Sequence, residues 1–374
     1  MTGDQVVSQT GCPGSVDADR AARPVTRRAI LASAALVAAT VRGRYPALAG
    51  PTALPASPTI LVAGPPGSYV DQWAALITGP LGKSLLLGEA IGRENIGGPD
   101  GVTGANHFQA STPPDGGTAM IIPGAAALSW LVGDPRVRFD AGNWVPLWGG
   151  TTPVLAVTRV ALARGRSVRV AVQTLVGSEL AVLLALELMG IEAVAVPVGA
   201  GAATSFDRPD IDLVVLRGPE LKQLAPEMAA RRWTHAFTLG MIGADGRVVR
   251  NPAMADAPTA LELIDRDAAV PPGRAGLERF SELSSALRAV TAAAMLDFAL
   301  VVPLLAPAAV VAWWRQGCIG LASAPELQEA ATKRLVRPAE TGAVVASMSA
   351  ITADPTALLE LRRWLEERHH WRPA

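Results

Sequence analysis

The sequence predicts an α/β protein with a mostly parallel sheet that helices cover on both faces. Half of its 374 residues are hydrophobic and 18% are charged, which is enough apolar material for a sizeable core and excludes a disordered chain. Uninterrupted apolar segments of strand length alternate with segments of helical spacing. Strands that are apolar throughout are typical of sheets buried on both faces. The length corresponds to about two domains of ordinary size.

The charges and the cysteines argue against two classes of function. Lys and Arg number 33, and Asp and Glu also number 33, so no excess of positive charge indicates binding to nucleic acid. The two cysteines are Cys12 and Cys318. They are too few for a four-thiol metal site, and we expect no disulfide that holds the fold.

Residues 1–49 are predicted to be a twin-arginine signal peptide. Arg27 and Arg28 precede an apolar run over 29–41, which is too short to cross a bilayer core of about 30 Å as a helix. Ala47-Leu48-Ala49 then has the small-x-small pattern of a signal-peptidase site. Export to the periplasm is the favoured interpretation, and a retained membrane anchor is the alternative.

Strands and helices are expected to alternate after residue 58. Apolar, β-branched segments predict strands at 59–63, 119–122, 154–158, 168–172, 193–197, 212–216 and 298–302. Helical spacing predicts helices at 70–79, 178–189, 277–296, from about 307 onward, and at 356–369. The segment 295–314 also has the composition of a membrane span. Asp297, Pro303 and Pro307 argue against a span, because a carboxylate in a membrane helix is costly and proline breaks the hydrogen-bond ladder.

The loops that follow the strands are the expected ligand sites. In sheets of this kind, ligands bind at the carboxyl ends of the strands, where helix N-termini attract small anions. Loops rich in Gly, Ala, Ser and Thr are expected at 64–69, 96–104, 122–127, 173–178 and 199–204. Small side chains let a ligand approach the backbone closely.

The residues do not assemble into a catalytic set, so we expect neither an enzyme nor a cofactor. No Gly-x-Ser-x-Gly elbow or Gly-Lys-Ser/Thr phosphate loop is present. Asp210 and Asp212 have the spacing of an acid–base pair, but solvated carboxylates at a strand edge are the favoured interpretation. No metal site is expected, because none of the histidines has an acidic or cysteine neighbour at ligand spacing: His107, His235, His369 and His370.

Five short blocks follow one another in the mature chain. They are Pro65-Pro66-Gly67-Ser68-Tyr69-Val70-Asp71, then Glu94-Asn95 with Pro114-Asp115-Gly116-Gly117-Thr118, then 196–202, Asp256-Ala257-Pro258-Thr259 and Leu304-Leu305-Ala306-Pro307. In kind and in order they resemble the motifs of the periplasmic solute receptors of tripartite tricarboxylate transporters, also called Bug receptors. The resemblance covers nearly all of the mature chain.

This resemblance implies a fold of the periplasmic-binding-protein type II kind, with two Rossmann-like lobes joined by a hinge. Lobe 1 would comprise 57–157 and 296–374, and lobe 2 would comprise 158–240. A loop and an extra helix at 241–295 have no assigned role. The strands 154–158 and 236–239 would cross between the lobes. We expect a monomer that captures a small carboxylated metabolite without any reaction and delivers it to integral membrane permease subunits.

The resemblance also implies ligand-binding positions in the first lobe. Pro66, Gly67, Ser68 and Tyr69 match the first ligand loop. Gly124 and Ala125 lie in the second, 122–127, which lacks the hydroxyl groups of typical members. A loop without hydroxyl groups favours a monocarboxylate with an aliphatic or aromatic body.

In the second lobe the implied positions are Thr174, Ser178, Gly199 and Arg217. Ser178 is explained equally well as a helix N-cap. Arg217 is expected either to hold a carboxylate or to lie on the surface beside a turn. The family's aspartate for amino groups falls on Leu216, so an amino-acid ligand is disfavoured.

Three other functions stay open at the level of sequence. A sensing or adaptor protein would share the fold and differ in its membrane partner. A degenerate paralogue would bind its ligand weakly. An enzyme that uses the cleft ranks last, because the chain lacks a catalytic set.

Overall fold

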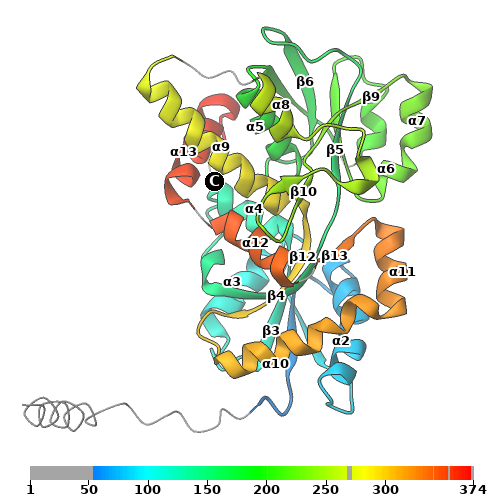
Figure 1. The fold of residues 1–374 in the computed structure, drawn as a ribbon, viewed down its shortest axis with the longest axis vertical. Helices are drawn as coiled ribbons and strands as arrows, with labels where there is room; N and C mark the ends of the chain where they lie inside the picture. The colour runs from blue at the N-terminus through cyan, green and yellow to red at the C-terminus, as the bar shows by residue number, and fades with distance from the viewer. Residues whose placement is uncertain (1–53, 200, 268–271, 340, 353, 372–374) are drawn as a thin grey trace, which may run out of the picture. The chain divides into compact units, whose positions relative to one another are not determined.

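The computed structural model describes residues 54–199, 201–267, 272–339, 341–352 and 354–371 (Figure 1). The predicted signal peptide, including Arg27 and Arg28, lies outside the described residues. Two main sheets, each flanked by helices, form the two lobes. The α/β class and the two-lobed architecture are confirmed.

The first lobe contains a mixed sheet in the order β13-β4-β12-β3-β1-β2. Its strands are β1 (Thr59–Ala63), β2 (Gly92–Ile96), β3 (Thr118–Pro123), β4 (Trp144–Thr151), β12 (Leu296–Pro303) and β13 (Arg337–Ala339). β1 is parallel to β2 and β3, whereas β12 runs antiparallel between β3 and β4. β12 follows the second lobe in the chain, so this sheet is completed only when the chain returns.

The second lobe contains a sheet in the order β7-β6-β8-β5-β9. Its strands are β5 (Val154–Thr158), β6 (Ser167–Val172), β7 (Glu192–Pro197), β8 (Leu213–Arg217) and β9 (Thr234–Thr238). A short hairpin follows, β10 (Met241–Ile242) and β11 (Val248–Val249). β5 is antiparallel to both β8 and β9, whereas β6 is parallel to β7 and β8, so the sheet is mixed, with β5 reversed against the shared direction of its other strands.

The two strands predicted to cross between the lobes lie in the second sheet, and the first of them begins directly after the passage from the first sheet. The strands expected to cross, 154–158 and 236–239, correspond to β5 and β9, which pair with each other inside the second sheet. The chain leaves the first sheet after β4 and enters the second at β5, through Thr152 and Pro153. The lobe boundaries drawn from the sequence stay a prediction.

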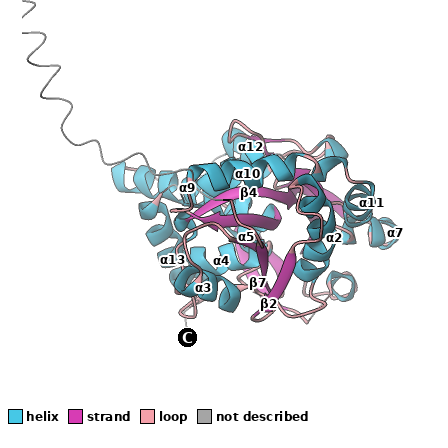
Figure 2. Ribbon diagram, turned by 90° about the horizontal axis from the view of Figure 1, so that it is seen from below, coloured by secondary structure: helices cyan, strands magenta, loops and turns pink. Residues whose placement is uncertain are grey.

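Helices pack on both faces of the strands, because side chains alternate along a strand. In β1, Ile60 and Val62 pack in the core that contains Trp73 of α2, whereas Leu61 packs in the core that contains Phe108 of α3. Figure 2 shows α2 on one side of the strands and α3 and α4 on the other. In the first lobe the helices are α2 (Tyr69–Ser84), α3 (Val102–Ser111), α4 (Gly124–Val132), α10 (Ala308–Ile319), α11 (Pro325–Arg334), α12 (Thr341–Thr352) and α13 (Pro355–His369).

The remaining helices precede the return to the first sheet. They are α5 (Glu179–Leu188), α6 (Glu220–Gln223), α7 (Ala225–Ala230), α8 (Ala260–Asp267) and α9 (Arg274–Met295). α9 contacts α5 in the second lobe and α4, α12 and α13 in the first. Its last two turns are rich in buried alanine, 289–294, whose small side chains allow this close packing. The extra helix predicted at 277–296 therefore lies against both lobes.

The segment that resembles a membrane span folds as predicted. β12 and α10 replace it, with Pro303 at the end of the strand and Pro307 as the residue before the helix. Among the described residues, no single helix has the length and hydropathy of a membrane span, and only the bent pair α12 and α13 passes that test jointly.

A glycine pair tests the packing of α3 on the first sheet. A Cβ atom at Gly104 would lie 2.6 Å from Ala63 Cα and 2.7 Å from the Ile96 carbonyl oxygen. We expect Gly104→Ala to lower the free energy of unfolding by about 1–3 kcal/mol, because backbone atoms cannot yield to the methyl group. In α12, a Cβ at Gly342 meets only Ala244 Cβ at 3.6 Å.

Gly342→Ala is the matched control, and it should raise the free energy of unfolding by up to about 1 kcal/mol through helix propensity. Urea unfolding measures both variants. Equal effects of the two substitutions would contradict the close approach of α3 to β1 and β2.

Candidate functional site

A buried carboxylate, Asp297, lies where the two lobes meet. Its side chain is 1% exposed, and its Oδ1 lies 3.4 Å from Nη2 of Arg217 at the end of β8. Trp73 of α2 donates its indole N–H to Oδ2 at 2.9 Å. The Tyr69 hydroxyl, at the start of α2, is a further hydrogen-bond partner. Groups from α2, β8 and β12 therefore converge on one carboxylate.

Burial raises the pKa of Asp297, against the opposing effect of the Arg217 guanidinium and the two hydrogen bonds. Burial, together with the negative charge of Asp297, raises the pKa of Tyr69 to about 12. Tyr69 is therefore neutral at physiological pH and can donate its proton to Asp297 in a hydrogen bond.

Arg217 is held by backbone oxygens as well as by Asp297. Its Nε donates to the Ala294 carbonyl at 3.3 Å, and its Nη2 donates to the Leu296 carbonyl at 3.1 Å. Ala294 lies in the last turn of α9 and Leu296 is its C-cap residue, so both carbonyls lie at the negative end of the helix dipole. Arg217 is thus not a free surface side chain but a contact from the second lobe to the α9–β12 junction.

Arg334, from the C-terminal end of α11, covers the aromatic part of this site. Its guanidinium lies 5.2 Å from the ring centroid of Tyr69 and 4.9 Å from that of Trp73, within the range of cation–π attraction. Nη2 donates to Gln72 Oε1 at 2.6 Å. Residues 69, 73, 217, 297 and 334 form what we call the aspartate site.

The first ligand loop predicted from the sequence forms the N-terminal end of α2. Gly67 has a φ of 78°, a conformation that favours glycine, and its N–H donates to Asp71 Oδ2 at 2.8 Å. Ser68 is the N-cap, and its Oγ accepts from Asp71 N at 3.4 Å. Pro66 is exposed beside them. The backbone donor expected to bind a ligand here is occupied by the chain's own Asp71.

The prediction of a second ligand loop at 122–127 is wrong, because a helix begins within it. Gly124 and Ala125 form the first turn of α4, because the alanines that follow favour a helix. A Cβ at Gly124 would lie 2.2 Å from the Leu296 carbonyl oxygen and 2.5 Å from that of Ala293. The start of α4 therefore packs directly against the α9–β12 junction.

The predicted residues of the second lobe are dispersed. The Thr174 side chain is hydrogen-bonded within its own loop, where its Oγ1 accepts from Val176 N at 3.2 Å. Ser178 is the residue before α5, but its side chain makes no capping hydrogen bond. Gly199 is exposed, next to a residue outside the described ranges. Of the predicted positions, the structure brings Tyr69 and Arg217 together, at Asp297.

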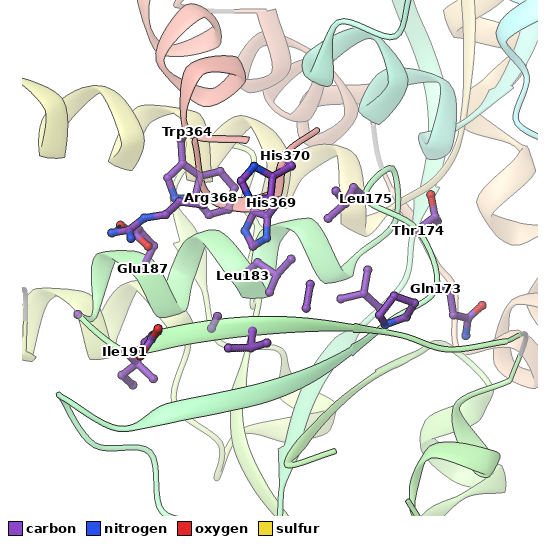
Figure 3. Close-up of a pocket in the computed structure, with 17 residues that line it drawn as sticks. Gln173, Thr174, Leu175, Leu183, Glu187, Ile191, Trp364, Arg368, His369 and His370 are labelled. Carbon is purple, nitrogen blue, oxygen red and sulfur yellow. Dashed lines mark hydrogen bonds and ion pairs between the residues drawn. The ribbon is translucent and has the colours of Figure 1, made fainter. Parts of the chain in front are cut away.

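Two large cavities lie elsewhere. One, of about 990 Å³, is lined by Met228, Met241, Met254 and Met295 among others, and we call it the methionine cavity. The other, of about 770 Å³, lies between β7 and the end of α13. Figure 3 shows Gln173 and Thr174 at one end of this second cavity and Glu187 and Arg368 at the other. Neither cavity is lined by the first ligand loop or by Arg217.

Several titratable groups outside the aspartate site are paired or buried. Asp210 pairs with Arg208, and Asp212 pairs with Arg169. Burial raises the pKa of the Cys318 thiol to about 12, and burial lowers the pKa of His369 beside Trp364. In the part of the chain that the structure describes, no three His, Cys, Asp or Glu side chains are placed to hold a metal ion.

Comparison with solved structures identifies the fold. A TctC solute binding protein from Polaromonas, crystallised without ligand, superimposes with a TM-score of 0.58 at 13% identity, over 84% of this chain and 99% of that one. The chain has the fold of a TctC solute-binding protein. No protein-family model matches it, and no curated protein matches it significantly by sequence.

Two further solved structures superimpose on this chain with lower TM-scores. The periplasmic binding protein BugD has a TM-score of 0.48 at 14% identity, over 84% of this chain and 97% of its own. MatC from Rhodopseudomonas palustris, with bound malate, has a TM-score of 0.45 at 18% identity, over 83% and 98%.

Most of the aspartate site is not predicted from the sequence. Trp73 and Arg334 were not singled out, and Asp297 served only as evidence against a membrane span. An aspartate inside a buried apolar strand needs compensating donors, and this requirement is the signal that could have marked it. The identity of the donors depends on which strands and helices become neighbours.

The pH dependence of stability tests the burial of Asp297. Because its pKa is raised in the folded state, its contribution is fully present below the unfolded pKa of about 4 and is lost as pH rises through the folded pKa. The free energy of unfolding of the native chain, minus that of Asp297→Asn, should therefore fall as pH rises above about 4.

Asp134→Asn is the matched control with the opposite sign, because its hydrogen bonds from Arg136 hold the pKa of Asp134 below its usual value. The free energy of unfolding of the native chain, minus that of Asp134→Asn, should be largest above about pH 4 and should decrease at lower pH. Urea unfolding from pH 3 to 8 measures both. If the free-energy difference for Asp297 does not change with pH, the pKa of its buried carboxyl group is not raised.

Substitutions of two serines test which helix N-terminus is stabilised by a capping side chain. Ser68→Ala removes the cap of α2 and should lower the free energy of unfolding by about 1 kcal/mol. Ser178→Ala, before α5, should change it by less than about 0.5 kcal/mol, because no capping bond is lost. Thermal unfolding distinguishes the two, and an equal loss at Ser178 would restore its assignment as a cap.

Proposed function

We propose that this chain is a periplasmic solute receptor of the tripartite tricarboxylate transporter family, the Bug receptors. It captures a small carboxylated metabolite between its lobes, as a monomer, and presents it to integral membrane permease subunits. The observation that carries this proposal is the two-lobed fold shared with a TctC solute-binding protein. The five sequence blocks in family order support it. Binding involves no reaction.

The ligand-binding positions of this proposal are those implied by the resemblance. Helix N-termini carry unpaired N–H groups and a partial positive charge, which suits a carboxylate. α2 and α4 both begin at the side of the first lobe that meets Arg217. The proposed contacts are Pro66, Gly67, Ser68, Tyr69, Gly124, Ala125, Thr174, Ser178, Gly199 and Arg217.

The aspartate site supports a carboxylate as the ligand group. Tyr69, Trp73 and Arg217 already accommodate one carboxylate, that of Asp297. A solute carboxylate that binds Arg217 competes with Asp297 for the guanidinium. Leu216 is buried and apolar at the neighbouring position, so the side chain at position 216 supplies no counter-charge for an amino group.

The location follows from the same proposal. Arg27 and Arg28, the apolar run after them and the small-x-small site compose a twin-arginine signal. A receptor exported by this route acts in the periplasm, where it meets both the solute and the permease.

A thermal-shift screen of carboxylic acids on the mature protein tests the proposal. A ligand at 100 times its dissociation constant adds about 2.7 kcal/mol to the free energy of unfolding, so the transported acid should give a clear shift. Arg217→Ala should weaken binding of that acid at least about tenfold, because a charge-assisted hydrogen bond is lost. Asp297→Asn should tighten binding by removing the competing carboxylate.

Arg247→Ala is the matched control, because its side chain is 85% exposed in a loop, and it should leave the shift unchanged. The proposal fails if no carboxylic acid stabilises the protein. A full shift in Arg217→Ala would remove that residue from the proposed site.

A further inference from the structure

The methionine cavity lies between elements of the two lobes. α11 and β13 form one side, α6 and α7 form the other, and Thr152 and Pro153 of the connection between the lobes lie at its wall. Figure 1 shows α11 of the first lobe facing α6 and α7 of the second. Its volume of about 990 Å³ is at the upper end of the range for pockets that hold small organic ligands.

The interior of this cavity is apolar and adaptable. Met228 and Trp233, both nearly buried, line it together with Met254 and Met295. Methionine side chains are flexible and polarisable, so they fit ligands of different shape. A tryptophan ring adds a flat apolar surface for an aliphatic chain or an aromatic ring. These groups suit the body of an apolar ligand.

The charges of the cavity have one sign. Lys222 and Arg337 line it, and its lining in the described ranges includes no Asp or Glu. Neither Lys222 nor Arg337 forms an ion pair with a carboxylate of the described residues, and the guanidinium of Arg337 donates a hydrogen bond to the Met241 sulfur at 3.4 Å. A cavity with basic side chains and no acidic ones attracts an anion.

We propose that the methionine cavity binds an amphipathic carboxylate, a medium-chain aliphatic or aromatic monocarboxylate. The apolar body lies against Met228, Trp233 and Met254, and the carboxylate meets Lys222 and Arg337. The site is separate from the aspartate site, since none of the five aspartate-site residues lines it. Binding in this cavity can therefore be tested apart from binding at the aspartate site.

Calorimetric titration of the mature protein with decanoate tests this site. Decanol has the same body without charge, and decyltrimethylammonium has the opposite charge, so both should bind at least about tenfold more weakly than decanoate. The double variant Lys222→Ala/Arg337→Ala should lose at least about tenfold in decanoate affinity. Arg247→Ala, which removes a basic side chain far from the lining, should lose nothing.

Two variants fill the cavity without disturbing the core. Ala229 and Ala225 line it and are exposed, so Ala229→Trp and Ala225→Trp should fold as the native chain does and abolish decanoate binding. Circular dichroism checks the fold of each. Undiminished binding by both filled variants, or by the double variant, would overturn the proposal, as would the absence of decanoate binding to the native chain.

Arg217→Ala separates this proposal from the proposed receptor function. Decanoate affinity should be unchanged in Arg217→Ala, whereas the affinity for a small polar carboxylate should fall. If Arg217→Ala abolishes decanoate binding and Ala229→Trp does not, decanoate binds at the aspartate site and the methionine cavity is not its site.

Discussion

The contact between Asp297 and Arg217 is the interaction on which the junction of the two lobes depends. A carboxylate with a 1% exposed side chain is costly unless charge and hydrogen bonds compensate it. The compensation comes from α2 of the first lobe, through Trp73 and Tyr69, and from β8 of the second, through Arg217. Removing Arg217 takes the ion-pair partner from a buried carboxylate, and removing Trp73 or Tyr69 takes a hydrogen-bond donor from it.

The same contact constrains the backbone around it. Arg217 also binds the carbonyls of Ala294 and Leu296 at the α9–β12 junction, and the first residue of α4 must be glycine to approach the same junction. α4, α9, β8 and β12 are therefore fitted to one another at a point where a larger side chain cannot be placed. The small residues along the end of α9 extend this close packing to α5 and α12.

The aspartate site and the methionine cavity differ in how their charges are balanced. At the aspartate site Arg217 already has Asp297 as its carboxylate partner. A solute carboxylate therefore gains affinity only to the extent that it binds Arg217 more favourably than Asp297 does. At the methionine cavity Lys222 and Arg337 have no carboxylate partner among the described residues, and an incoming anion displaces only water. An apolar body is therefore expected to contribute most of its affinity there.

The sequence by itself determined the local elements and the fold class, because apolar periodicity and turn residues act within a few positions of the chain. β1, β5 and the return through β12 and α10 follow the predicted segments closely. The strand order, the antiparallel entry of β5 and β12, and the helical start at Gly124 were decided by the tertiary structure. So were the partners of Asp297, since Trp73 and Arg217 become its neighbours only when the two sheets are assembled. A buried charge can be recognised in the sequence as a charged residue inside an apolar run. The groups that stabilise it are distant in the chain, so their identity depends on how the strands and helices pack.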